Sequence, residues 1–557
     1  MRDNPDKSSI KARRWLKAAA WVVGVAVFLF VGLFFFTIWM QHRLERMVAA
    51  QSKGVYRLHL HGLETSPFLG SLSVDSLILK PDHERWQQLS KQGQKVPRTL
   101  LELRTGTINL RKLSYTRAFL KQEVRLDELV VQQPTLLLSV MQADTTPAHQ
   151  PLHETAEGFL QGLAIGKINV RQANLYYRDG TAPDTLFSLR SFQLAVDDFR
   201  LDSASFLAKG RAYYGKKYKL AGANAHVLFP DEFYKLSTDS INVDTQAGEL
   251  LLQSIKIVPL AEPAAMARAK GEAVTHQEAE AAQVWLKGID FGEHSRHNTV
   301  RVKYALLQSP TLTAFKDKQN FQDKGRKKLP HELVQSIKTP FLIDSLELKS
   351  GYIRYAELVP EAAERGHITF HHLNAGFSNI SNIKGQVTRE KPTIVKASTK
   401  VMDRALLEVT IRLPLLDENG FHTLEGTIGE TNLQMLNPIL MPTGFVRVES
   451  GHVTRGKFRV ELNKAQANGS MHLHYNNLKL DLLTKGTGGE QSFGKKVLSK
   501  VADKVAIKDS NPSKGEKPRQ GTITVTRDPG KSVFSYWKDC LSSGFMSSMG
   551  LEGMAEQ

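Results

Sequence analysis

The sequence predicts a mainly β protein: a transmembrane helix near the N-terminus, followed by an elongated, repeat-built β-groove with a few short helices. Three observations indicate this fold class. They are a six-residue cassette that returns along the chain, a larger block that occurs twice, and one long apolar run. With 557 residues the chain exceeds the size of one compact core, so elongation or several modules are expected. A hydrophobic content of 41% and an aromatic content of 8% are ordinary for a folded protein.

The cassette consists of an apolar residue, Asp, Ser or Glu, Leu or Ile, any residue, and a second apolar residue. It occurs at 74–79, 126–131 and 343–348, more weakly at 238–243, and with Gly in place of Asp at 165–170. Apolar residues alternate as in a strand on both sides of the Asp, but the phase slips by one residue across it. Because such a slip would turn a strand over, a bulge or tight corner must absorb it, and Asp and Gly tolerate that geometry. The cassette therefore predicts a bent strand that keeps one apolar face inward.

The apolar residues of the cassettes are the candidates for lining this inward face. They are Val74, Leu77, Leu126, Leu129, Ile168, Val170, Leu346 and Leu348. Two arrangements remain open, because the face either closes into a core of the protein's own side chains or stays open as a groove for an apolar ligand.

A larger block surrounds the cassette and occurs twice in the same order. The matching pairs of segments are 130–136 (VVQQPTL) with 306–312 (LLQSPTL), 165–177 with 343–355, and 188–192 with 369–373. The offset between the copies drifts by only a few residues, as loop insertions would cause. This pattern indicates tandem duplication of an all-β module. We therefore expect an N-terminal β region over 41–123, a first β module over 124–298 and a second over 299–484.

An uninterrupted apolar run over residues 18–39 is long enough to span a bilayer, at about 1.5 Å per residue or about 33 Å in total. Trp15, Trp21 and Trp39 lie where aromatic residues anchor such a helix at the interface. A cleaved signal peptide would have a shorter apolar core and small residues at its cleavage site, so an uncleaved anchor over 18–40 is favoured. More basic residues precede the run than closely follow it, which predicts a cytoplasmic tail over 1–17 and a translocated body.

The net charge is +18, from 74 basic and 56 acidic residues. Such a balance suits nucleic acid or an anionic membrane surface. Because the body is expected on the far side of the membrane from DNA, we interpret the charge as membrane proximity and expect no nucleic-acid partner. The single cysteine, Cys540, excludes an intramolecular disulfide.

The C-terminal part differs in character from the β modules. Apolar residues every four positions, interleaved with lysines, predict a basic amphipathic helix and a linker over 485–520. A strand and a second amphipathic helix are expected over 521–557. The candidates for a membrane or partner contact are Phe493, Val497, Val501, Val533, Phe534, Trp537, Leu541 and Phe545. The alternative is that each helix docks on the β-structure and caps its open edge.

No motif in the sequence predicts an active site or a cofactor. Residues 489–495 fit the glycine-rich phosphate loop, but Lys496 stands where the hydroxyl ligand of Mg²⁺ is required. The pairs at 59/61 and 472/474 place two histidines on one face of a strand, where solvent-facing side chains are the simpler interpretation. The adjacent histidines at 371/372 point to opposite faces. We therefore expect a protein that is not an enzyme and holds no metal or other cofactor.

Four further segments carry a resemblance to a known family: 436–440 (LNPIL), 448–453 (VESGHV), 469–483 (GSMHLHYNNLKLDLL) and 527–537 (RDPGKSVFSYW). Together with the anchor, the cassettes and the duplicated module, they make the chain similar to the AsmA-like family of Gram-negative envelope proteins. It resembles especially the single-anchor members of the Bacteroidota. The resemblance covers nearly the whole chain, and its motifs are structural.

Members of this family are thought to be inner-membrane-anchored, β-rich grooves that carry phospholipid through the periplasm or otherwise support outer-membrane assembly. The resemblance therefore implies a single-pass inner-membrane protein with its bulk in the periplasm. Its partners would be phospholipid or another acyl-chain ligand, the inner membrane, and an outer-membrane or envelope protein. The alternative is a structural or assembly factor for outer-membrane proteins or envelope biogenesis that acts through strand-edge contacts. The two functions differ in what fills the inner face, acyl chains or polypeptide.

Overall fold

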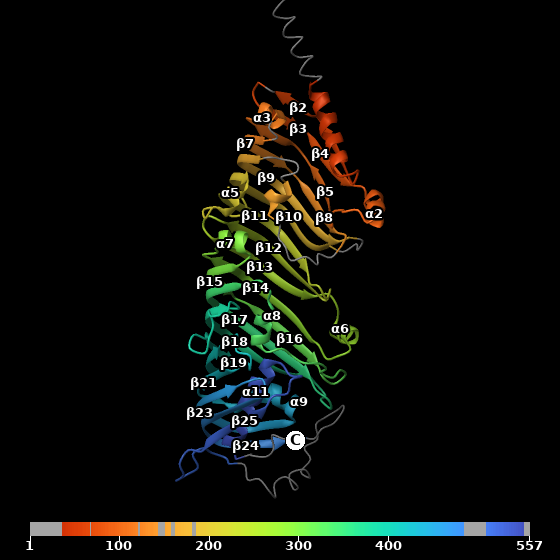
Figure 1. Cartoon of the computed structure of the whole chain (residues 1–557). Helices are drawn as coiled ribbons and strands as arrows, with labels where there is room; N and C mark the ends of the chain where they lie inside the picture. Colours follow the sequence, from red (N-terminus) through yellow and green to blue (C-terminus); the bar gives the residue numbers. More distant parts are fainter. Residues whose placement is uncertain are drawn as a thin grey trace, which may run out of the picture. The chain divides into compact units, whose positions relative to one another are not determined.

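The computed structural model describes residues 36–66, 68–120, 123–142, 151–156, 162–180, 185–483 and 508–550, and these residues are mainly β (Figure 1). The chain divides into two compact units, Met1–Ala223 and Asn224–Gln557, each of which is described by itself. The expected anchor lies outside the described residues up to position 35. Of the helices in the described ranges, none is both long and apolar enough to cross a bilayer.

The described part of the first unit contains ten complete strands, one longer helix near the N-terminus and four shorter helices. The strands are β1 (Tyr56–His61), β2 (Glu64–Ser66), β3 (Ser71–Val74), β4 (Ser76–Pro81), β5 (Thr99–Thr105), β6 (Ile108–Arg111), β7 (Glu123–Gln132), β8 (Thr135–Val140), β9 (Gly162–Asp179) and β10 (Thr185–Leu201). The helices are the N-terminal helix over 36–51, α2 (His83–Lys91), α3 (Tyr115–Leu120), α4 (Leu152–Ala156) and α5 (Ser203–Leu207). The boundary between the units falls within β11 (Lys217–Leu228).

Most rungs of the first unit's ladder are long strands that are broken near the middle. β1 and β2 pair antiparallel with β4 and β3, which pair with β5 and β6, and these pair with β8 and β7. β7 and β8 then both run parallel to the long strand β9, which pairs antiparallel with β10. The breaks fall at Gly62, Asp75 and Gly106, and at Gln133, which has a positive φ of 49°.

The break at Asp75 produces the bend that the cassette predicts. Val74 ends β3 and Leu77 lies in β4, yet both pack into one cluster with Met40 of the N-terminal helix. The backbone N–H of Asp75 donates to the carbonyl of His61, 3.0 Å away, so the backbone is bonded at the corner. The phase slip therefore keeps both apolar side chains on one face, as expected.

The second unit continues with longer strands and a short helix at several of their connections. The strands are β12 (Tyr234–Asp244), β13 (Glu249–Pro259), β14 (Thr275–Lys287), β15 (Val300–Gln308), β16 (Thr311–Asp317), β17 (Phe341–Leu358), β18 (Gly366–Ser381), β19 (Thr393–Val401), β20 (Ala405–Leu413), β21 (His422–Ile428), β22 (Thr431–Asn432), β23 (Val446–Leu462), β24 (Gln466–Leu482) and β25 (Gln520–Thr526). The helices are α6 (Pro263–Lys270), α7 (Phe291–His297), α8 (Pro330–Ser336), the 3-10 helix η1 (Leu433–Leu436), α9 (Asn437–Gly444) and α11 (Val533–Ser548).

Neighbouring strands of the second unit pair antiparallel from β12 to β25, with one exception. The exception is the pair β15 and β16, which are broken at Pro310 and run parallel to β17. β15 and β16 therefore stand to β17 as β7 and β8 stand to β9 in the first unit.

The two copies of the duplicated block have the same strand order and the same register. Leu129 lies opposite Ile168 in the first block, and Ala305 lies opposite Leu346 at the matching place in the second. Positive φ angles also coincide: Gln133 (49°) with Ser309 (49°), Gln172 (52°) with Ser350 (55°), and Ser191 (60°) with His372 (51°). The repeated sequence thus specifies both the pairing and the places where the strands bulge.

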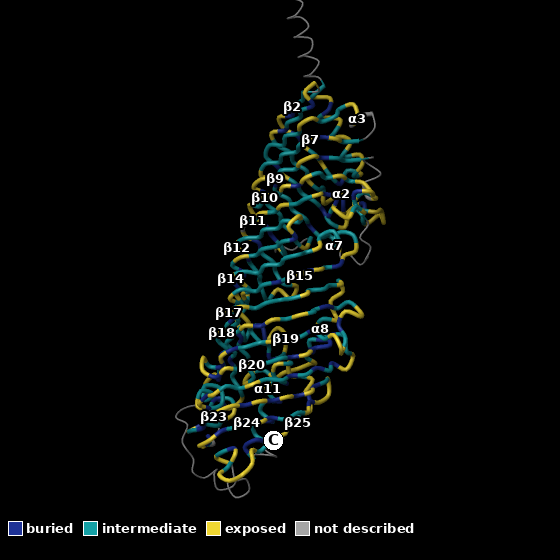
Figure 2. Tube along the Cα trace, turned by 90° about the vertical axis from the view of Figure 1, so that its left-hand side faces the viewer, coloured by how far each residue is buried: buried dark blue, intermediate teal, exposed yellow. Residues whose placement is uncertain are grey.

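The buried residues gather at several places in the two units (Figure 2). In the first unit, the N-terminal helix packs through Met40 on Leu60 and Val74. A smaller cluster surrounds Trp86 and Leu89 of α2. Asp82 is the N-cap of this helix, and its side chain accepts from the backbone N–H of Arg85. In the second unit, the large core lies between β19–β25 and α11.

Candidate functional site: an apolar face on each unit

Two adjacent rows of paired residues cross the second unit from β12 to β25 and contain no charged side chain. Direct partners in a ladder share one face of the sheet, so each row is a stripe across that face. The first row runs Val243, Leu250, Leu286, Ala305, Leu346, Phe377, Val395, Ile411, Leu424, Val460, Gly469, Ile523. The second runs Ile241, Leu252, Val284, Leu307, Leu348, Ala375, Ala397, Val409, Gly426, Phe458, Met471, Gly521.

Burial along these rows changes from one end to the other. From β12 to β18 most of the larger side chains, such as Leu250, Leu346 and Phe377, are only half-buried. From β19 onward most of them are buried, and Val460 and Ile523 are 0% exposed, although Val409 is half-buried. Figure 2 shows the same change from intermediate to buried positions within the unit. The apolar face therefore has an open section over β12–β18 and a covered section over β19–β25.

Over β23–β25 the cover of the second section is α11, which approaches the sheet closely through small residues, and Val334 of α8 packs against the same core. A Cβ on Gly521 would lie 2.6 Å from the carbonyl oxygen of Gly544, and a Cβ on Gly544 would lie 2.9 Å from Ile523. On the same stripe of the helix, Tyr536 is 2% exposed and Cys540 is 0% exposed. Glycines at the contact let the backbones come together where larger side chains would hold them apart.

The stripe that α11 buries most deeply is not the predicted one. The four-residue spacing in the sequence places Val533, Trp537, Leu541 and Phe545 on one stripe, but the helix buries Tyr536, Cys540, Gly544 and Ser548. The first set has the larger apolar side chains, so the sequence pattern favours it. The helix buries the second set because Gly544 and Ser548 are small enough to let its backbone approach the sheet closely. Trp537, Leu541 and Phe545 flank the contact and pack against the same core, Val533 is half-buried, and Phe534 is 73% exposed.

α11 also covers the outer edge of the last strand. The backbone N–H groups of Thr522 and Thr524 donate to the hydroxyls of Ser547 and Ser543, at 2.8 and 3.2 Å. At the first strand of the first unit, the N-terminal helix does the same for Leu60, whose N–H donates to Glu45 and whose carbonyl accepts from Gln41. An edge strand with free donors and acceptors is a template for pairing with another chain. Side chains occupy these donors and acceptors on both edges.

The contact between α11 and the sheet includes a buried histidine. His422, 0% exposed, has its Nδ1 2.9 Å from the carbonyl of Gly420, and the indole N–H of Trp537 donates to its Nε2 over 3.0 Å. Burial, followed by the nearby His331 and Arg527, lowers the pKa of His422 to about 4. Burial also lowers the pKa of His331, which packs on the His422 ring at 5.6 Å between centroids. The contact therefore depends on a neutral His422.

The first unit carries a comparable pair of apolar rows, one on each side of the line of breaks. On one side the paired residues are Leu72, Leu110, Leu129, Ile168 and Val196. On the other side they are Leu58, Leu79, Leu103, Leu136, Leu175 and Leu189. The N-terminal helix covers the first rungs, where Leu58 and Leu72 contact its cluster, and Leu129, Leu136 and Ile168 further on are half-buried.

The structure divides the eight candidate lining residues into two groups. Val74 and Leu126 are 4% and 6% exposed, and Leu77 packs under the N-terminal helix, so these three do not contribute to an open surface. Leu129, Ile168, Val170, Leu346 and Leu348 are half-buried. Leu129 and Ile168 are direct partners in the first unit, whereas Leu346 and Leu348 belong one to each row of the second. In β12–β14 the cassette is weak or missing, so the sequence alone does not indicate that the rows continue through these strands without a charged residue.

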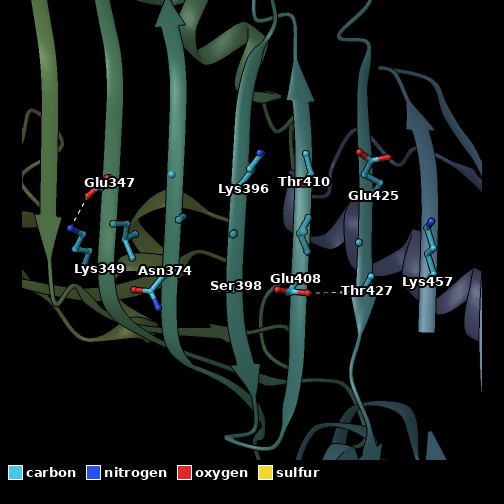
Figure 3. A pocket seen from close by; sticks show the side chains of 16 residues that line it. Glu347, Lys349, Asn374, Lys396, Ser398, Glu408, Thr410, Glu425, Thr427 and Lys457 are labelled. Carbon is cyan, nitrogen blue, oxygen red and sulfur yellow. Dashed lines mark hydrogen bonds and ion pairs between the residues drawn. The ribbon is translucent and has the colours of Figure 1, made fainter. Parts of the chain in front are cut away.

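The opposite face of the second unit is polar and has a hollow of about 750 Å³ over β17–β23 (Figure 3). Its charged residues are Glu347, Lys349, Lys396, Glu408, Glu425 and Lys457. Glu347 pairs with Lys349 at 2.8 Å, and hydrogen bonds from Lys349 and Tyr304 lower the pKa of this carboxyl. With three charges of each sign, the hollow favours neither anions nor cations, and we interpret it as a solvated face.

The remaining candidates from the sequence are placed as follows. His59, His61 and His472 are exposed and His474 is half-buried, and within the described ranges no group of three or more metal-binding side chains is found. The phosphate-loop match and the contact candidates Phe493, Val497 and Val501 lie outside the described residues. No protein-family model matches the chain, and no curated protein matches it significantly.

Proposed function

We propose that this chain is a membrane-anchored, non-enzymatic protein of the cell envelope that binds or conducts phospholipid along its apolar face toward the outer membrane. The observation that carries the proposal is the open section over β12–β18, where two adjacent rows without a charge remain half-buried. A folded protein does not usually leave a stripe of this kind facing water unless something binds there.

An acyl chain fits this surface better than a polypeptide does. The side chains of the open section offer apolar contact, and each CH₂ removed from water contributes about 0.8 kcal/mol. A polypeptide on the same face would bring backbone amides to a surface without partners for them, which is unfavourable. Strand-edge capture of a client protein, the alternative function, has less support because Thr522, Thr524 and Leu60 already bond to helix side chains.

The proposed topology is one pass through the inner membrane by residues 18–39, with the N-terminus cytoplasmic and the bulk periplasmic. The length of the apolar run and its basic flank support it. A reporter that is active only in the cytoplasm, fused after Gln557, should be silent. An active reporter would mean the opposite orientation.

The test of the lipid path compares two charges placed on neighbouring strands but on opposite faces. Leu346→Asp puts a carboxylate in the first row, and Ser378→Asp puts one next to its partner Phe377 on the polar face. A charge beside an acyl chain costs several kcal/mol, so Leu346→Asp should lose co-purifying lipid whereas Ser378→Asp should keep it. Mass spectrometry of lipids bound to the full chain measures this, with Leu129→Asp as the equivalent change in the first unit.

Thermal melting separates an open face from a closed core. An open face has water or lipid beside Leu346, so the variant should melt within a few degrees of the wild type. If Leu346→Asp unfolds the protein and loses lipid together, the face is a core and the proposal is wrong.

A further inference from the structure

The two most exposed large apolar side chains in the described residues are neighbours. Phe68 is 81% exposed and Leu69 is 76% exposed, and both lie in the turn between β2 and β3. Scattered single apolar residues on a surface need no explanation, but an adjacent aromatic and aliphatic pair at the tip of a turn does.

The turn is held in place on its C-terminal side and closed by its own backbone. The N–H of Leu69 donates to the carbonyl of Ser66 at 3.2 Å, and the carbonyl of Gly70 accepts from Leu113 at 2.7 Å. One residue further on, the hydroxyl of Tyr115 donates to the carbonyl of Ser71 at 2.6 Å. The two apolar side chains are thus presented on a bonded base, so little ordering is needed when they bind.

β2 lies beside the first described residues of the N-terminal helix (Figure 1). The hydroxyls of Thr37 and Thr65 are 2.9 Å apart, which places β2 against the first described turn of the helix. On that turn Ile38 and Trp39 are themselves 37% and 44% exposed. Four exposed apolar side chains therefore belong to the two segments that this contact joins, where the apolar run over 18–39 reaches the described residues.

Basic side chains flank these apolar ones. The Arg43 guanidinium lies 5.0 Å from the centre of the Trp39 ring. Lys112, next to the hydrogen bond that holds Gly70, has a side chain that is 76% exposed and pairs with Asp127 at 2.6 Å. Apolar and aromatic side chains bordered by cations are typical of segments that lie in the interface of an anionic bilayer.

We propose that the Phe68–Leu69 turn inserts into the interface of the bilayer that the N-terminal run spans, as a second membrane contact beside the anchor. This inference rests on the proposed anchor, and it adds that the first unit is held against the membrane at two points. The contact brings the first rungs of the apolar face to the bilayer surface from which a phospholipid would be taken.

The test is site-specific labelling of an introduced cysteine, which is possible because the single native cysteine of the chain is buried. Cys540 is 0% exposed and burial raises the pKa of its thiol to about 12, so a thiol reagent labels an introduced cysteine selectively. A fluorophore is attached to Phe68→Cys, or to the matched control Lys95→Cys, an exposed position beyond α2 in the same unit. Each full-length variant is placed in nanodiscs of phosphatidylethanolamine and phosphatidylglycerol, with and without brominated acyl chains.

The label at 68 should lose most of its emission to brominated lipid and little to aqueous iodide, and the label at 95 should behave in the opposite way. If the chain elutes with the discs and iodide quenches both labels equally, the turn is not in the bilayer, although the anchor stands. If the chain does not elute with the discs, the anchor fails and this inference fails with it. Lipid lost from Leu346→Asp is measured separately, so the fate of the lipid path does not decide this result.

Discussion

The hydrogen bond between Trp537 and His422 should make the docking of α11 depend on pH. An indole nitrogen can only donate, so Nε2 of His422 must be its unprotonated acceptor, and Nδ1–H must donate to the carbonyl of Gly420. A second proton would have to go on Nε2, where it breaks the bond to Trp537. Charging His422 therefore opposes both its burial and its principal contact with α11.

The magnitude follows from the pKa of about 4 in the folded protein and about 6.5 in the unfolded chain. Because the folded pKa is the lower one, the unfolded chain takes up the proton first as the pH falls. The stabilisation is complete above about pH 6.5 and is lost between pH 6.5 and 4. At about 1.36 kcal/mol per pKa unit the full loss is about 3 kcal/mol, of which about 2.5 kcal/mol is lost by pH 4.5.

The measurement compares the wild type with His422→Gln, whose amide can accept from Trp537 and donate to Gly420 without titrating. The protein is unfolded in urea at pH 7.5 and at pH 4.5. Hydrogen exchange in peptides of α11 reports how much of the covered section is unfolded at each urea concentration. Carboxylates titrate alike in both proteins, so the difference between the two pH dependences isolates the histidine. Equal losses of stability in wild type and variant would refute the reasoning.

Three further predictions concern the backbone and the edge. Gly521→Ala places a Cβ 2.6 Å from the carbonyl oxygen of Gly544, so α11 must shift, and the free energy of unfolding should fall by about 1–3 kcal/mol in urea titrations. Ser350 has a φ of 55°, so Ser350→Gly should raise the melting temperature, whereas Ser350→Val should lower it, with a difference of at least about 1 kcal/mol between them. The double change of Ser543 and Ser547 to Ala removes the hydroxyls that accept from β25, at a cost of about 1 kcal/mol each. It should also promote self-association, which light scattering would detect; a monomer as stable as the wild type would contradict the role given to these hydroxyls.

The positions where strands bend or break could be predicted from the sequence, because a few neighbouring residues determine each of them. The cassette at Asp75 specifies a corner, and the match of residues 306–312 to 130–136 anticipates the same break before the same parallel pairing. The extent of the apolar rows could not be predicted, since it depends on which residues become partners across strands. Leu250 and Val284, for instance, lie in no strong cassette and join the rows only through pairing.

The sequence predicts that a C-terminal helix could dock on the sheet, but it does not predict which side of the helix makes the contact. The sequence pattern indicates a helix over 533–545, and docking was one of its two interpretations. Which side docks is decided by the glycine contact between Gly521 and Gly544, a distance in space that no periodicity contains. The bond of Trp537 to His422 likewise joins residues far apart in the sequence.

The arrangement of covered ends and repeated rungs has a consequence for how proteins of this design can change in length. The special residues sit at the terminal strands, where Ser543, Ser547 and Glu45 occupy edge groups. Within the second unit, the strands from β12 to β25 carry the same two apolar rows, so a strand inserted among them would meet the same apolar stripe on both sides. Each added strand would lengthen the stripe of that unit by about 4.8 Å without disturbing its contact with α11. The length of this stripe, which sets how far an apolar ligand could travel along the unit, then becomes a property that evolution can set in whole steps.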